Sequence, residues 1–465
     1  MGDGSGEDTS GDAAPSVPGA VAALCLIQFI DVLGVTVVVT ALPDMLADVG
    51  GSSGDSALVA TGYAMFFGGL LMFGARLGDR IGHRRTILTG IGSFAAGALF
   101  AATATTTVAL TAARCVQGAA AATAVPSALR LLTTVTPAGR DRARAVAAWS
   151  AAGAAAGASG FVAGGLVTDL AGWRVVFWGL LAVAAVQVAA VLLLVPGDRP
   201  GREHASLNLI GSVLLTSTVM LVVVGATLLG EESHRVSGTV LLVGGAVVSG
   251  VFVVADRRSS APLVPPRLLA VPQVFRGTTG SFLNTATTSG VATLITLYLQ
   301  GTLGRSPLAA AATLLPLSLS VMAGSAVAAR LIVQRARERV TAAGLALVGA
   351  GIALPLPAPT SAVLVGTGMA VVGFGLGVSA VATTSMGTDV PDRSRATASG
   401  LINTSAQLGT AIGTALVLLV AAFTTGRPGP GSGAPSLAWA VPAVLAVVAA
   451  AVFARLRPAR GRGAI

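Results

Sequence analysis

Long apolar runs separated by short polar loops constrain the fold of this 465-residue chain more than any other feature. A helix needs about 20 apolar residues to cross the hydrocarbon core of a bilayer. By this criterion we predict fourteen spans, at 20–43, 56–75, 86–105, 108–132, 145–168, 175–195, 207–230, 238–255, 277–300, 307–329, 340–357, 360–386, 396–424 and 436–454. Only 10% of the residues are charged, whereas soluble proteins carry about 25%. The sequence therefore predicts an all-α polytopic membrane protein.

The arginines predict how the chain is oriented in the membrane. The net charge of +10 comes from 29 arginines without a lysine. Of these, 23 fall in loops that the fourteen spans place on one side or in the C-terminal tail, and four fall on the other side: Arg174, Arg235, Arg305 and Arg427. Positive residues tend to stay cytoplasmic. Both termini are therefore expected in the cytoplasm, and the basic charge indicates topology and no nucleic-acid partner.

The first span carries an acid in its middle, Asp31. An ionisable group there costs on the order of 2.5 to 3.5 kcal/mol. Three interpretations remain open: a structural acid bonded to Ser or Thr, an ion-pair partner, and a proton-exchanging group that faces a cavity. The third is favoured because the cores of the other spans are almost free of acids. A second buried charge, Arg114, is predicted about 10 Å away along the membrane normal, and its alternative role is to extend to the interface.

Two segments suggest an internal repeat. "RARAVAAWSAAGAAAG" begins at Arg142 and "RSRATASGLINTSAQLGTAIG" at Arg393, and each opens on R-x-R-A followed by small residues. Many transporters build two halves around a midplane site from such repeats. We therefore expect a disordered tail at 1–18, a six-helix half at 19–196, two inserted helices at 207–255, a second six-helix half at 276–455 and a tail at 456–465.

Four strings carry a resemblance to a known family. They are "GARLGDRIGHRR" from Gly74, "LTAARCVQG" from Leu110, "YLQGTLGRSPLAAAATLLP" from Tyr298 and "ASGLINTSAQLGTAIG" from Ala398. Together they resemble the major facilitator superfamily, and the fourteen spans resemble its drug:proton antiporter branch. The resemblance implies the major facilitator fold, with two six-helix halves plus two inserted helices.

The resemblance also implies roles for individual residues. Asp79, Arg80 and Arg84 match a loop that the family uses as a latch in the outward-open state, although a simple cluster of arginines would also stop transfer through the membrane. Arg114 matches an arginine that takes part in proton coupling, here with Asp31. The chain departs from the family pattern at three positions: Ala75 and Phe161 replace a glycine and a proline, and Gly34 stands where an acid is expected.

Further candidates for packing and for the substrate cavity come from the spans. Small residues let membrane helices approach closely. In the fifth span they are Gly153, Gly157, Gly160, Gly164 and Gly165. Uncharged polar residues are candidates for the cavity, and interhelical hydrogen bonding is their alternative role. They are Gln28, Gln117, Asn284, Thr288, Tyr298, Gln300, Asn403 and Gln407.

The resemblance implies a secondary transporter of a bacterial cytoplasmic membrane that exports small amphipathic drugs or antibiotics in exchange for protons. Enzymatic activity, a cofactor and a metal site are not expected, because the three histidines lie in loops and no nucleotide-binding signature occurs. The partners are then a small-molecule substrate, protons and the lipid bilayer, with a monomer as the expected functional unit. Members of this family that handle divalent cations tend to carry a second membrane acid, and the tenth span lacks one. The resemblance therefore implies neutral, monocationic or weakly acidic substrates. A proton-coupled importer and a non-transporting membrane sensor or scaffold are the alternatives.

Overall fold

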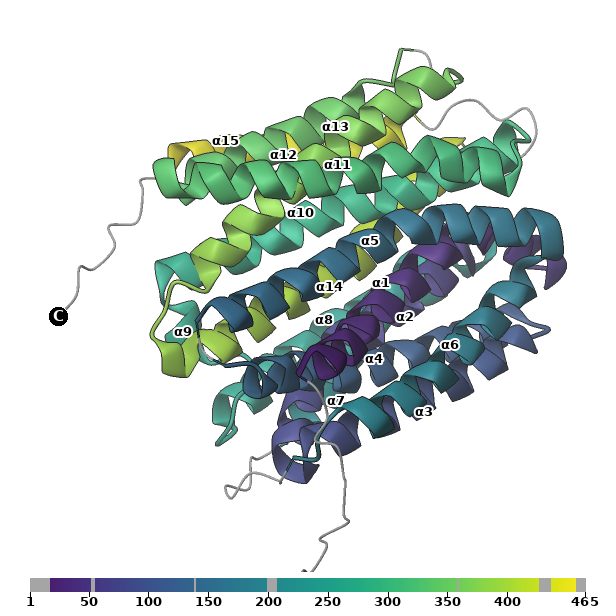
Figure 1. Ribbon diagram of the computed structural model, residues 1–465. Coiled ribbons are helices and arrows are strands. Elements are labelled where there is room, and N and C mark those ends of the chain that lie inside the picture. Colours follow the sequence, from purple (N-terminus) through teal and green to yellow (C-terminus); the bar gives the residue numbers. More distant parts are fainter. Residues whose placement is uncertain are drawn as a thin grey trace, which may run out of the picture.

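The computed structural model describes residues 17–51, 55–137, 139–198, 207–357, 359–425 and 436–456, and within them the chain is helical (Figure 1). The expected tails at 1–18 and 456–465 fall almost entirely outside the described residues. Seventeen helical elements are seen in the described part. In chain order their bounds are α1 Val17–Asp48, α2 Asp55–Ile81, α3 His83–Ala102, α4 Thr107–Val135, α5 Arg140–Ala171, α6 Trp173–Leu194, α7 Leu209–Leu229, η1 Glu232–His234, α8 Arg235–Arg258, α9 Pro266–Leu269, α10 Pro272–Leu297, η2 Tyr298–Thr302, α11 Pro307–Gln334, α12 Arg337–Ala353, α13 Ala362–Gly387, α14 Asp392–Thr425 and α15 Ser436–Arg455.

Several helices begin at a side chain that caps free backbone N–H groups. The hydroxyls of Thr106, Ser306 and Ser361 each accept a hydrogen bond from the backbone N–H three residues later, at the starts of α4, α11 and α13. Proline occupies the first helical position of α10 and α11, where its missing N–H costs nothing. These local signals set the boundaries of the helices.

Twelve helices in the described residues are long and apolar enough to cross a membrane. Two long helices fall short of this standard. α12 has 17 residues, and α10 is rich in threonine, serine and glycine. The structure thus supports a multi-pass membrane protein, and the expectation of fourteen spans stays a prediction at α10 and α12.

The two largest hydrophobic clusters of the described residues lie in two groups of helices, which we call the two cores. Figure 1 shows the two groups, with α10 to α15 above α1 to α6 in the view. One core is built from α1 to α6. The other is built from α10 to α15 with one residue of α5, Phe161. The helices cross closely at glycines: a Cβ on Gly344 would lie 2.6 Å from the backbone nitrogen of Ser379, so α12 and α13 touch backbone to backbone. We refer to the helices of the two cores as the first and second halves.

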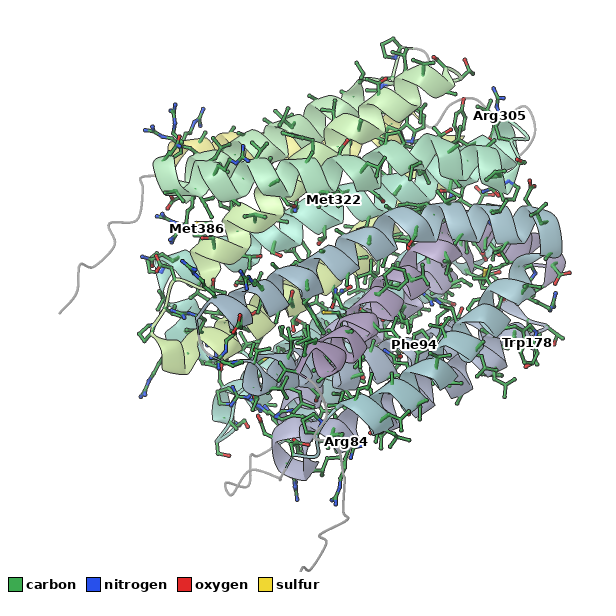
Figure 2. The ribbon with its side chains drawn as sticks, viewed as in Figure 1. Arg84, Phe94, Trp178, Arg305, Met322 and Met386 are labelled. Atoms are coloured by element: carbon green, nitrogen blue, oxygen red, sulfur yellow. The ribbon has the colours of Figure 1, made fainter. Side chains whose placement is uncertain are left out.

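We call the end of the bundle at which α1 begins and α2 ends the terminal side, and the other end the opposite side. Figure 2 shows Arg84 and Arg305 at these two ends. Apolar side chains of α6 and α8 are exposed between the ends, among them Trp178, Val243 and Val247. Such outward apolar faces are those that a bilayer would cover.

The α7–α8 pair lies against both halves. Gly69 of α2 faces Thr216 of α7, and Gly230 after α7 faces Ala422 of α14. At the terminal side the loop after α8 is tied to the first half: Arg76 donates hydrogen bonds of 2.8 Å to the carbonyls of Ala261 and Pro262.

Asp256, near the end of α8, also holds the loop after α8 in place. Its buried carboxylate accepts hydrogen bonds from Asn208 and from the backbone N–H groups of Leu263 and Val264, at 2.8, 2.7 and 3.0 Å. Both oxygens of this carboxylate therefore accept hydrogen bonds, from the residue that caps α7 and from the loop after α8.

Candidate functional site

Asp31 lies inside the first half and is bound by a tyrosine. Its side chain, 8% exposed, faces α2, α3 and α4, and its Oδ1 accepts a hydrogen bond from the hydroxyl of Tyr63 in α2. Tyr63 is itself 1% exposed. The acid thus has a specific protein partner within the hydrophobic core, which partly offsets the cost of burying it.

Arg114 completes this cluster from α4. Its side chain is fully buried, and its Nη1 donates to the carbonyl of Gly34 at 3.0 Å and to Gln117 Oε1 at 2.8 Å. The guanidinium carbon lies 4.9 Å from the centre of the Tyr63 ring, a cation–π contact. Tyr63 therefore contacts both the acid and the guanidinium.

Gly34, at the position where the family pattern has an acid, lies close to an aromatic ring. A Cβ on Gly34 would lie 3.2 Å from the ring of Phe94, which points into the first half (Figure 2). The carbonyl of Gly34 is used by Arg114. A side chain at position 34 would therefore require the Phe94 ring to shift by a few tenths of an ångström.

Sequence reasoning did not find Tyr63. The chain has only two tyrosines, and this one lies within a predicted span. The rarity of tyrosine in the chain was the available signal for Tyr63. The role of Tyr63 depends on the packing of α2 against α1, which the sequence does not reveal.

In the second half, two predicted cavity residues bond to helices. Ser379 of α13 donates to Asn284 Oδ1 at 2.5 Å, and Asn284 Nδ2 donates to the carbonyl of Leu376 at 3.3 Å. Thr288 donates to the carbonyl of Asn284 at 2.8 Å. Both side chains are buried, so the structure gives them interhelical and intrahelical bonds.

The other cavity candidates are dispersed. Tyr298 stacks edge-on against Trp439, with ring centres 5.4 Å apart. Gln300 Nε2 donates to the carbonyl of Thr40 at 2.9 Å and so joins the two halves. The remaining residues are placed as follows: Gln28 lies beside Gly153, Gln407 beside Gly68, and Asn403 is exposed one turn from Gln407.

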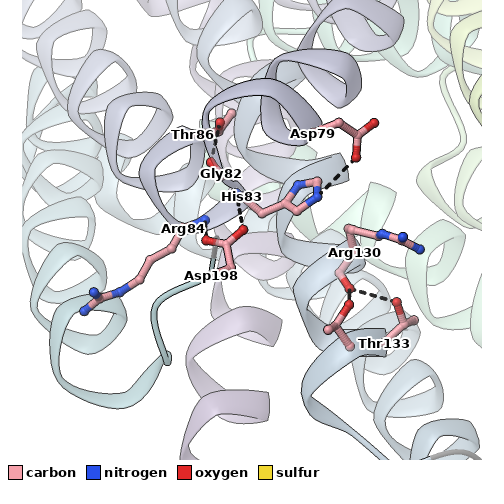
Figure 3. A network of polar contacts seen from close by, with 9 residues as sticks. Asp79, Gly82, His83, Arg84, Thr86, Arg130, Thr133 and Asp198 are labelled. Carbon is pink, nitrogen blue, oxygen red and sulfur yellow. Dashed lines mark hydrogen bonds and ion pairs between the residues drawn. The ribbon is translucent and has the colours of Figure 1, made fainter. Parts of the chain in front are cut away.

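The predicted latch residues are not joined to one another (Figure 3). Asp79 pairs with His83 at 3.3 Å, and Arg84 Nη2 donates to the carbonyl of Leu192 at 2.7 Å. Arg80 is exposed. No described residue of the second half bonds to Asp79, so the structure holds no cross-half latch within its described residues.

Asp198, a residue that the sequence did not point to, holds the start of α3. The carboxylate of Asp198 accepts from the backbone N–H groups of His83 and Arg84, at 2.5 and 2.9 Å. These N–H groups begin α3, where the helix dipole favours a negative charge. Asp198 therefore fixes the start of α3 to the segment after α6, as Figure 3 shows.

The five glycines of α5 face two neighbours. Gly153, Gly160 and Gly164 lie against α1, where their nearest contacts are Gln28, Thr36 and Val37 with Thr40. Gly165 lies against α11, and a Cβ there would be 2.6 Å from that of Ala311. Gly157 lies between the two, and its carbonyl accepts a hydrogen bond of 2.9 Å from Ser318 Oγ of α11.

Comparison with known proteins decides the family. Residues 24–414 match the Major Facilitator Superfamily. The chain belongs to this superfamily. The major facilitator assignment agrees with the two-core architecture described above, and it identifies the protein as a transporter and not an enzyme.

Related bacterial members are named for antibiotic export or resistance. The cephamycin export protein of Amycolatopsis lactamdurans is 33% identical over 422 residues, 88% of this chain and 86% of its own length. The puromycin resistance protein of Streptomyces alboniger is 34% identical over 70% of this chain and 64% of its own length. The lincomycin resistance protein of Streptomyces lincolnensis is 33% identical, with coverages of 70% and 66%.

Solved structures share the fold at low sequence identity. A peptide transporter POT in complex with sulfate aligns with a TM-score of 0.70 at 16% identity and covers 95% of each chain. The human organic anion transporter MFSD10 (TETRAN) aligns with a TM-score of 0.65 at 15% identity, covering 95% of this chain and 100% of that one. These likenesses establish the all-helical major facilitator fold.

Proposed function

We propose that this major facilitator protein exports small amphipathic antibiotics in exchange for protons, with Asp31 as the proton carrier. The observation that carries the proposal is the buried cluster of Asp31, Tyr63 and Arg114. Two other buried acids in the described residues, Asp256 and Glu338, lie near helix ends and are held by backbone N–H groups or by Arg276. Asp31 alone among these three lies in the middle of a membrane helix, where a buried acid usually has a function.

The proposed cycle uses the two halves as rocking units. Asp31 releases its proton on the terminal side, which we place in the cytoplasm because of the arginine distribution. Substrate then binds between the halves, the halves rock, and a proton from outside reloads Asp31 and expels the substrate. One proton moving down 100 mV supplies about 2.3 kcal/mol, enough for a substrate gradient of roughly 40-fold.

Contacts between the halves support a closed opposite side. Gln300 with Thr40, Ser318 with Gly157 and the packing of Gly165 on α11 all lie in the middle or the opposite-side part of their helices. The absence of a cross-half bond to Asp79 in the described residues agrees with this state, because the latch belongs to the conformation open to the outside. We propose that all fourteen long helices cross the membrane in this arrangement and that the protein works as a monomer in the bacterial cytoplasmic membrane.

Three relatives named for cephamycin, puromycin and lincomycin support an antibiotic as substrate. We propose neutral, monocationic or weakly acidic compounds, because the tenth predicted span, 307–329, carries no second membrane acid. Robust export of a divalent cation that stops when Asp31 alone is changed would contradict this choice.

The first experiment measures efflux of ethidium, puromycin and lincomycin from cells that express wild type or Asp31→Asn, with and without an uncoupler. Asp44→Asn, an acid near the opposite-side end of the same helix, is the matched control. Wild type and the control should lower accumulation, and the uncoupler and Asp31→Asn should each abolish this effect. If Asp31→Asn pumps normally, coupling lies elsewhere. Uptake driven by an inward proton gradient in right-side-out vesicles would instead indicate an importer.

A further inference from the structure

A small cavity adjoins Asp31 inside the first half. It has a volume of about 20 Å³ and is lined by α1, α3, α4 and α6. A cavity of roughly 10 to 15 Å³ or more can hold one water molecule if it offers polar partners. The space beside Asp31 is therefore sized for a single water.

Two polar side chains of the described residues line this cavity, Asp31 and Gln187 of α6. Gln187 is 2% exposed and makes no hydrogen bond to any described residue. Asp31 Oδ1 is taken by Tyr63, and no described residue donates to Oδ2. Two buried residues that line one cavity thus have an amide and a carboxylate oxygen without a partner among the described residues, and a bridging water would satisfy both.

The cavity lies on the terminal side of Asp31. α1 begins at the terminal side, so Ile27, which lines the cavity, is one turn nearer that side than Asp31. Gly34, whose carbonyl binds Arg114, is about one turn nearer the opposite side. Gln187 lies seven residues before α6 ends at the terminal side, about 10 Å along its axis. Arg114 and the cavity therefore flank the acid along the membrane normal.

We propose that one water molecule occupies this cavity, bridges Asp31 and Gln187, and accepts the proton that Asp31 releases toward the terminal side. The O–H bond of the Asp31 carboxyl breaks, an O–H bond to the water forms, and the resulting hydronium passes a proton to solvent. Gln187 stays neutral and positions the water. The proposal rests on the proposed function, in which Asp31 carries the proton, and it separates the proton route from the space between the halves.

Two variants test the water without the need for a known substrate. Gln187→Leu removes the polar partner, and Ala121→Val fills the cavity from α4. The measurement is the pH-induced infrared difference spectrum of the purified full-length protein. The carboxyl band that is present in wild type and absent in Asp31→Asn is assigned to Asp31. Both variants should move this band to higher frequency because the carboxyl loses its hydrogen-bonded water. Val186→Leu, an exposed residue of the same helix, should leave it unchanged.

A transport measurement gives the second readout. In proteoliposomes with ethidium or puromycin, both variants should slow proton-driven export about tenfold, the cost of roughly one hydrogen bond. Substrate–substrate exchange, which moves no net proton, should stay near wild type. Gln187→Glu, which can still hold the water, should restore driven export. A merely structural role would lower both rates together and overturn the proposal.

The failures of the two proposals can be told apart. If Asp31→Asn removes no carboxyl band and exports normally, Asp31 is not the proton carrier, and both proposals fail. If Asp31→Asn removes the band and stops driven export, while Gln187→Leu and Ala121→Val match wild type in band position and in rate, the water is overturned and the proposed function stands.

Discussion

At the scale of single residues, the site is a chain of contacts from Asp31 through Tyr63 to Arg114. The sequence pointed to the two charges because ionisable groups in membrane spans are rare and costly. It also left open whether Asp31 is a structural acid, an ion-pair partner or a proton carrier. The structure shows no direct ion pair between Asp31 and Arg114 in the described residues, because Tyr63 stands between them.

Tyr63→Phe tests the link between the acid and the arginine. Phenylalanine keeps the ring that contacts Arg114 and Phe67 but loses the hydroxyl that binds Asp31. Interhelical hydrogen bonds in membranes are worth about 0.6 to 1.7 kcal/mol, so thermal unfolding should be only slightly easier. Proton-driven export should fall more clearly, because Asp31 loses its protein donor.

The second tyrosine supplies the control for this prediction. Tyr298 packs its ring on Trp439, and its hydroxyl makes no hydrogen bond in the described residues. Tyr298→Phe should therefore match wild type in unfolding and in efflux. Equal losses in the two variants would show that the Tyr63 hydroxyl has no special role.

At the scale of helices, the glycines of α5 differ in how much room the neighbouring helix leaves for a side chain. A Cβ on Gly164 would lie 2.6 Å from the carbonyl oxygen of Val37, and a backbone atom cannot move aside cheaply. A Cβ on Gly157 would lie 3.8 Å from its nearest neighbour, an ordinary contact. The spacing of the glycines in the sequence does not distinguish them.

Alanine substitutions at Gly164 and Gly157 should therefore have different effects on the stability of the protein. Gly164→Ala is expected to destabilise the protein by about 1 to 3 kcal/mol through overpacking. Gly157→Ala should be neutral or slightly stabilising, because alanine favours a helix by up to about 1 kcal/mol over glycine. Thermal unfolding of the purified variants in detergent measures both, and a similar loss at the two sites would contradict the contact geometry.

At the scale of the whole molecule, the proposed cycle requires the contacts on the opposite side to open. Ser318 Oγ donates to the carbonyl of Gly157 across the halves, and a Cβ on Gly157 would lie 3.9 Å from this oxygen. The side chain at position 318 therefore points toward position 157 across the two helices. We choose a cysteine pair at these two positions to cross-link α5 to α11 by a disulfide.

Gly157→Cys with Ser318→Cys, in a background without the native Cys25 and Cys115, should lose export when oxidised and regain it after reduction. Each single variant should be insensitive to oxidation, which controls for damage by the oxidant. Export by the fully cross-linked protein at the wild-type rate would exclude any rocking motion that separates these helices.

The sequence by itself determined the helical membrane architecture, the family and the two buried charges. These properties are local in the sequence. The length of an apolar run, the placement of the arginines and the motif strings can be recognised without knowing how the helices pack. The count of spans was less secure at α10 and α12, where polar content and short length weaken the signal.

Only the tertiary structure decided which residues meet. Tyr63, Asp198 and Gln187 acquire their roles from neighbours on helices far away in the chain. The same holds for Asn284 and Thr288, which the sequence placed in a cavity and the structure bonds to α13 and to its own helix. A helix exposes several faces, and its apolar pattern in a membrane does not tell which face meets which neighbour, because lipid and protein interior are equally apolar.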